Sequence, residues 1–158
     1  TEMAHWQHVY GYGKTIGSLK VTPSTAAFEK AEEAPSVTYR IYAKTAGKYE
    51  MELFTAPNNP VVYQGKMCVA YQVNNTETAL LNTIPDEGFV PWLSYSWERG
   101  VLDQIHKAAC TVELQEGENE VTIFALDPAV VLEKIVFTKE GCEKKKSYLG
   151  PVESYRVK

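Results

Sequence analysis

The chain lacks several features that mark whole classes of proteins. Its 158 residues include three cysteines, an odd number without the spacing of paired metal ligands, so no disulfide framework is expected. It also lacks a signal-peptide pattern and the run of roughly 18 apolar residues that a membrane-spanning helix needs. Positive charge is not in excess, because 20 Asp and Glu outnumber 16 Lys and Arg. Neither a nucleic acid nor a membrane is therefore an expected partner.

Apolar alternation is the clearest pattern that the chain does contain. Residues 117–137 have the pattern of a turn, a strand, a corner at Asp127-Pro128 and a second strand. Alternate residues share a face in each strand: Val121, Ile123 and Ala125 in the first, and Val131, Ile135 and Phe137 in the second. Period-two spacing is typical of half-buried strands packed on a core. This part of the chain is therefore expected to be scaffold.

The same kind of pattern recurs along the chain. Eight segments are predicted to be strands: Lys14–Val21, Val37–Lys44, Tyr49–Thr55, Met67–Val73, Ala79–Asn82, Ala108–Leu114, Val121–Leu126 and Val130–Thr138. Short glycine-bearing segments at 45–48 and 115–119 have hairpin length. We therefore predict an all-β jelly-roll β-sandwich of about eight antiparallel strands, like that of a carbohydrate-binding module, in one domain spanning residues 1–158.

The remaining segments are predicted to be loops. Residues 25–34 have helical composition, but prolines bracket them and Phe28 is their one large apolar anchor, so we expect a loop with one helical turn. The stretch from Pro85 to Trp97 is also expected to be a loop. The tail at 147–154 contains a Gly-Pro turn, and it either folds back onto the sandwich or docks on a neighbour.

A family resemblance spans the chain from Trp6 to Ser154. Residues 117–137, with the tail sequence Ser-Tyr-Leu-Gly-Pro from Ser147, resemble the C-terminal domain of glycoside hydrolase family 115, the xylan α-1,2-glucuronidases. Two further patches agree with it, at residues 9–15 and at 35–49. The chain departs from the family pattern at Ala129, where glycine is expected, and at Val152, where a second proline is usual.

The resemblance implies an accessory domain rather than an enzyme. The catalytic machinery of this family lies upstream, and the chain begins at Thr1 without an initiator methionine, as expected for the C-terminal part of a multidomain hydrolase. The upstream catalytic domains are then the expected partners, together with xylan and a second copy of the parent. An extracytoplasmic location, in the periplasm or the medium, follows from the family alone. Glycoside hydrolysis needs two facing carboxylates, and the acidic residues here fall in turns and surface positions.

Aromatic residues are the candidates for sugar contact. The loop around Pro91 carries Trp92, Tyr95 and Trp97, and flat rings on a rigid loop can stack on the C–H faces of sugars. Tyr63, beside a second loop, is a candidate of the same type. The alternative is that Trp97 begins the next strand and packs inward, while Trp92 plugs the end of the sandwich.

Metal ligands are sparse in the sequence. His5 and His8 lack a third partner, so no metal is predicted there, and His106 is expected to be structural. Asp127 is a candidate ligand for a structural calcium ion, although no dense Asp and Asn cluster surrounds it. No other cofactor is expected.

Two functions therefore remain open. An accessory domain that docks on the catalytic core is expected to expose a contiguous apolar patch. An independent module that binds xylan-type polysaccharides through Trp92 and Tyr95 is expected to align its aromatic rings on a platform instead.

Overall fold

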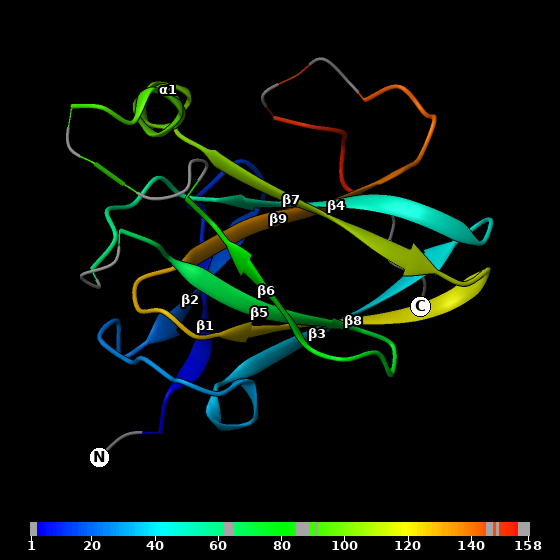
Figure 1. The fold of residues 1–158 in the computed structure, drawn as a ribbon, viewed down its shortest axis with the longest axis horizontal. Coiled ribbons are helices and arrows are strands. Elements are labelled where there is room, and N and C mark those ends of the chain that lie inside the picture. The colour runs from blue at the N-terminus through cyan, green and yellow to red at the C-terminus, as the bar shows by residue number, and fades with distance from the viewer. Residues whose placement is uncertain are drawn as a thin grey trace.

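Two antiparallel sheets face each other in the computed structural model, which describes residues 3–61, 65–84, 89–90, 92–144, 147 and 149–154 (Figure 1). The first sheet has five strands in the order β1 (His5–Tyr10), β2 (Gly17–Thr22), β9 (Val131–Lys139), β4 (Gly47–Thr55) and β7 (His106–Leu114). The second sheet has four, in the order β3 (Ser36–Ala43), β8 (Gly117–Ala125), β5 (Cys68–Val73) and β6 (Ala79–Asn82). The predicted all-β jelly-roll sandwich is confirmed.

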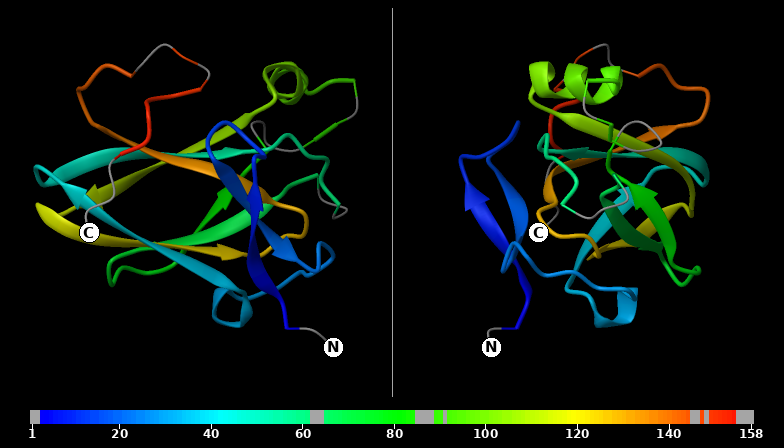
Figure 2. Two further views of the ribbon diagram at one scale, coloured as in Figure 1. Left: turned by 180° about the vertical axis from the view of Figure 1, so that it is seen from behind. Right: turned by 60° about the vertical axis from the view of Figure 1, so that its left-hand side comes forward.

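Each of the eight predicted strands is present, with boundaries that shift by up to four residues. The sequence missed β1, because its residues, HWQHVY, do not alternate cleanly between apolar and polar. Trp6 and Val9 are half-buried, and they lie an odd number of positions apart. Figure 2 shows β1 and β2, in blue, standing across the edge of the sandwich at a steep angle to the other strands.

The core lies between the sheets and follows the predicted alternation in β8, where Val121, Ile123 and Ala125 are buried. In β9 the prediction is partly wrong. The pairing of β4 with β9 shifts register between Phe54 and Thr55, so that Glu133 is bulged out of the ladder. A bulge moves the residues before it to the opposite face. Leu132 therefore enters the core in place of Val131, while Ile135 and Phe137 pack against the core as predicted.

A helix, α1 (Tyr95–Asp103), leads into β7, so the predicted loop from Pro85 to Trp97 is wrong at its end, and so is the alternative in which Trp97 begins the next strand. Gly100 in the helix interior weakens the sequence signal for a helix. The turn predicted in residues 25–34 is present as a short 3-10 helix, η1 (Ala31–Glu33). No helix in the described part of the chain is long and apolar enough to cross a membrane.

The tail folds back over the outer face of the five-stranded sheet, where Figures 1 and 2 show it as an orange and red arch. The Lys134 side chain, on β9, donates to the carbonyl oxygens of Leu149, at 3.3 Å, and of Pro151. Gly150 lies against the ring of Phe54, which forms a small outer cluster with Ile105 and Val136. Of the two alternatives for the tail, the fold-back is the one observed.

Candidate functional site

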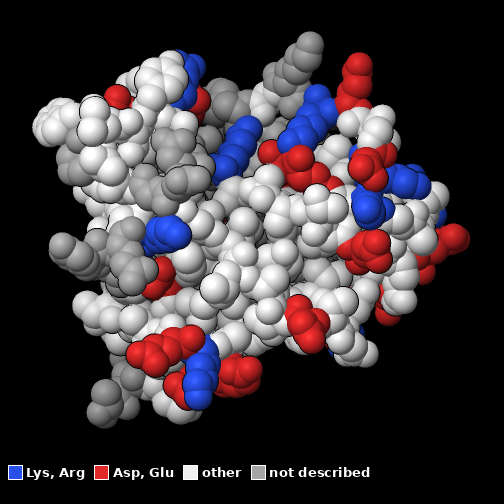
Figure 3. Space-filling view, viewed as in Figure 1, with Lys and Arg blue, Asp and Glu red and all other residues white. Residues whose placement is uncertain are grey.

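An exposed apolar surface covers the corner of the molecule around α1. We call it the helix patch, and its residues are Val90, Trp92, Leu93, Tyr95 and Leu102. Trp92 is 91% exposed and Tyr95 76% exposed. Tyr95 and Leu102 are seven residues apart and so lie on the same face of the helix. Figure 3 shows mostly uncharged atoms at this upper left corner.

Trp92 has an unusual backbone conformation. Its φ angle is 66°, in the left-handed region that bulky residues rarely adopt. This conformation costs about 1–2 kcal/mol for a residue with a Cβ atom. Because the ring is almost wholly exposed, packing within the described chain does not offset that cost. Strain of this kind is concentrated at functional positions in proteins.

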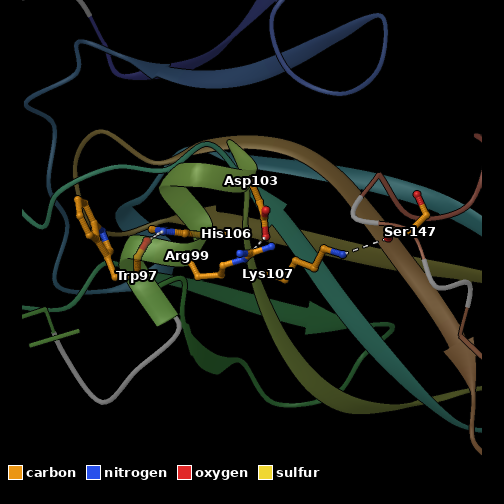
Figure 4. A network of polar contacts seen from close by, with 6 residues as sticks. All are labelled: Trp97, Arg99, Asp103, His106, Lys107 and Ser147. Carbon is orange, nitrogen blue, oxygen red and sulfur yellow. Dashed lines mark hydrogen bonds and ion pairs between the residues drawn. The ribbon is translucent and has the colours of Figure 1, made fainter. Parts of the chain in front are cut away.

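Buried groups behind the helix patch hold it in place. Trp97, a candidate for sugar contact, instead packs inward as in the alternative interpretation, and its Nε1 donates to the carbonyl oxygen of Asn58 at 2.9 Å. Its ring centroid lies 4.6 Å from that of Phe89. The imidazole of His106, 1% exposed, places Nε2 at 3.0 Å from the carbonyl oxygen of Trp97, and this nitrogen therefore donates (Figure 4). Burial lowers the pKa of His106, although the hydrogen bond to Trp97 opposes that shift.

The other predicted site residues do not join the helix patch. Tyr63 lies outside the described residues. Asp127 accepts a hydrogen bond from the backbone N–H of Cys68 at 2.6 Å, and its own N–H donates to the Cys68 carbonyl oxygen at 3.0 Å. The Asp127 carboxylate therefore holds the backbone at the start of β5. Within the described ranges, no group of three His, Cys, Asp or Glu side chains is placed to hold a metal ion.

A second exposed aromatic surface lies on the β1–β2 hairpin, and sequence reasoning missed it as a site. We call it the hairpin platform: His8, Tyr10 and Tyr12. Tyr10 is 85% exposed. The ring centroids of His8 and Tyr10 are 4.1 Å apart, and the ring planes meet at 85°. The Tyr-Gly-Tyr-Gly run at residues 10–13 was the available signal, since it places one aromatic at the end of β1 and a second in the loop that follows.

A buried carboxylate underlies this hairpin. Glu133, at the bulge in β9, is 8% exposed and lies against Gly13, where an added Cβ atom would be 3.1 Å from its Cγ and Cδ atoms. Burial raises the pKa of Glu133, and the charge of Lys14 partly opposes that shift. The side chain of Glu133 on β9 thus contacts both Gly13 and Lys14 in the loop of the hairpin.

A groove of about 280 Å3 runs between the tail and the outer face of the five-stranded sheet. Its lining combines three lysines with two glutamates. Lys144 contacts Glu50 and lies 3.4 Å from Glu52, and the hydrogen bond to Glu50 raises the pKa of Lys144. Lys107 lies over the ring of Phe54, 4.6 Å from its centroid. The groove therefore has no clear preference for a positively or a negatively charged ligand.

Solved structures show which folds the chain is similar to. It matches BtGH115A, a family GH115 4-O-methyl-alpha-glucuronidase with specificity for decorated arabinogalactans, with a TM-score of 0.63 and 17% identity, over 85% of this chain and 16% of that one. It also matches a family 35 carbohydrate binding module from Clostridium thermocellum, with a TM-score of 0.56 and 14% identity, over 84% of this chain and 86% of that module. For Xyl-CBM35 in complex with a glucuronic acid containing disaccharide, the TM-score is 0.54 at 12% identity, over 84% of this chain and 81% of that one.

At these identities the solved structures establish the fold, and the chain spans less than a fifth of the length of BtGH115A. No curated protein matches the chain. A family model, however, matches residues 1–153, almost the whole sequence. The match agrees with the resemblance carried by residues 117–137 and by the tail. The chain belongs to the glycosyl hydrolase family 115 C-terminal domain family.

Proposed function

We propose that this chain is a non-catalytic accessory domain of a family 115 glucuronidase, and that the helix patch docks it on the upstream catalytic domains of the same polypeptide. The carrying observation is the group of five exposed apolar residues on α1 and on the segment before it, Val90, Trp92, Leu93, Tyr95 and Leu102. The proposal requires no cofactor. A second copy of the parent enzyme is a further partner that this surface could meet.

The chemistry of the patch suits a protein partner. Three of its five residues are aliphatic, and these offer no hydrogen bond to a sugar hydroxyl, whereas apolar cores with Trp and Tyr anchors are typical of protein interfaces. The length of BtGH115A supports the choice of occupant, because most of that protein lies outside the matched region. A large catalytic part is then available to cover the patch.

The carboxylates of the chain support a non-catalytic role. Glu50 and Glu52 lie on one strand and are both engaged by Lys144. Glu133 has a raised pKa, as a general acid would, but it is buried under the hairpin and beyond the reach of a polysaccharide. We therefore assign hydrolysis to the upstream domains. The proposed substrate of the whole enzyme is a glucuronate-bearing polysaccharide, glucuronoxylan by family resemblance, and the proposed location is extracytoplasmic.

Binding of the chain to the separately produced upstream part of its parent tests this function. We expect saturable association that Trp92→Ser with Leu102→Ser weakens about 30-fold or more, since loss of an anchoring Trp costs about 2 kcal/mol or more. Tyr42→Ser, which removes an exposed aromatic from β3, is the matched control. Association that survives the double substitution, or that never occurs, would contradict the proposal.

An independent carbohydrate-binding module is the second candidate function. The observation that favours it is the exposure of the Trp92 and Tyr95 rings on a fold shared with family 35 modules. Titration with glucuronoxylan oligosaccharides, followed by tryptophan fluorescence, tests it. Saturable binding that Trp92→Ala abolishes would support this candidate, and a flat signal up to millimolar sugar would reject it.

A further inference from the structure

The aromatic face of β1 is not used by the proposed docking. Trp6, His8 and Tyr10 alternate along the strand and so share one face. Trp6 is half-buried, and its Nε1 donates to the carbonyl oxygen of Pro35 at 3.1 Å, which fixes the inner end of the row. His8 and Tyr10 continue the row into solvent. β1 is also the edge strand of its sheet, so no further strand flanks it in the described chain.

A glycine sets the orientation of these rings. Gly17, on β2, pairs with Tyr10 across the hairpin. A Cβ atom at Gly17 would lie 2.4 Å from Nε2 of His8, so the imidazole occupies the space that any other residue would fill. From this position the His8 ring meets the Tyr10 ring edge to face. The exposed phenol is therefore supported by a neighbour, although it is open to solvent.

The turn of the hairpin is held as well. The N–H of Gly11 donates to the carbonyl oxygen of Ile16 at 3.1 Å and closes the loop. Gly13 rests on the buried side chain of Glu133. A surface that is ordered before its ligand arrives loses less conformational entropy on binding.

We propose that the hairpin platform is a carbohydrate-binding site. The ring of Tyr10 stacks on the C–H face of a pyranose, the hydroxyl of Tyr12 binds its hydroxyl groups, and His8 supports the Tyr10 ring. Flat rings with polar edges suit this amphipathic ligand, whereas the aliphatic side chains of the helix patch do not. The site is separate from the docking surface and does not rest on the proposed docking.

Calorimetric titration of the chain with arabinogalactan and glucuronoxylan oligosaccharides tests the platform. We expect binding that Tyr10→Ala weakens about tenfold or more, in line with the loss of a stacked ring. Tyr10→Phe keeps the ring and is expected to keep the affinity within about twofold. Tyr42→Ala, at an exposed tyrosine of the other sheet, is the matched control, and circular dichroism verifies the fold of each variant.

Three outcomes would overturn the proposal. Binding of neither saccharide up to millimolar concentration is the first. The second is binding that Trp92→Ala abolishes and Tyr10→Ala leaves intact, which would move the sugar to the helix patch. The third is loss of self-association, or of docking on the upstream domains, in Tyr10→Ala without any sugar binding. Docking that fails while Tyr10-dependent sugar binding persists would reject the proposed function alone.

Discussion

The helix patch and the hairpin platform are built with the same device, a histidine ring lying on a glycine. A Cβ atom at Gly100 would be 1.9 Å from Cδ2 of His106, and one at Gly17 would be 2.4 Å from Nε2 of His8. The two histidines differ in burial, since His106 is buried and His8 is exposed. A buried ring cannot move aside, whereas an exposed ring can. The packing around Gly100 is therefore expected to tolerate an added methyl group less well than the packing around Gly17.

The two regions also respond to acid in opposite directions. The pKa of His106 is lowered by burial, so the stability that it contributes is lost as the pH falls from the ordinary histidine range through the lowered value. The pKa of Glu133 is raised by burial, so its contribution is present at low pH and is lost as the pH rises through the raised value. A fall in pH is thus expected to destabilise the region of α1 around His106 and to stabilise the contact between Glu133 and the β1–β2 hairpin.

Gly100→Ala is expected to have the largest effect. Replacing glycine by alanine inside a helix normally stabilises by about 1 kcal/mol. Here the methyl group would overlap His106 and lie 2.9 Å from the carbonyl oxygen of Ile105, so we expect a loss of about 3 kcal/mol. Chemical denaturation measures it, with Val101→Ala on the same helix as control. A gain in stability would show that the helix corner is not tightly packed.

Gly17→Ala is expected to cost less, about 1 kcal/mol, because the exposed His8 ring can swing away. The added methyl group would still lie 2.9 Å from the carbonyl oxygen of Val9. Adding His8→Ala to this variant is expected to recover part of the loss, and a double-mutant cycle measures the coupling. A loss equal to that of Gly100→Ala would remove the contrast between the two regions.

Trp92→Gly is expected to stabilise the isolated domain by about 1 kcal/mol or less, because glycine relieves the left-handed strain at φ 66°. The same change is expected to remove docking, which would separate stability from function at this position. Thermal unfolding measures the first effect, and binding to the upstream domains measures the second. Leu93→Gly, where φ is not positive, serves as control and is expected to lower stability.

The pH dependence of local opening in α1 and in the hairpin is the smallest expected effect. Hydrogen exchange between pH 4 and pH 7, which brackets the ordinary pKa values of Glu and His, is expected to show faster local opening of α1 and slower opening of the hairpin as the pH falls. Glu133→Gln is expected to remove the response of the hairpin and to leave that of α1. A response of one sign in both regions would contradict the assignment of the two groups.

The strands could be predicted from the sequence because apolar residues alternate in them, as Val121, Ile123 and Ala125 do. Alternation does not reveal a bulge, and for this reason Leu132 replaces Val131 in the core. It also does not reveal α1, whose one inward aromatic, Trp97, can equally begin a strand. Because the helix was not predicted, the sequence could not place Leu102 on the same surface as Trp92 and Tyr95.

The candidate site was therefore predicted in part. Trp92 and Tyr95 are exposed, as a binding role requires, but their aliphatic neighbours became visible only in the fold. The platform could not be predicted, because it depends on β1 being a strand and on His8 lying over a glycine nine residues away.

The helix patch and the hairpin platform are proposed to have different partners. Hydrogen exchange of the domain, compared between the isolated chain and the longer parent polypeptide, tests this claim most directly. We predict protection of residues 92–102 in the parent, with residues 8–16 unchanged until a glucuronate-bearing saccharide is added. Protection of the hairpin by the parent itself, with the helix patch still exposed, would contradict the claim.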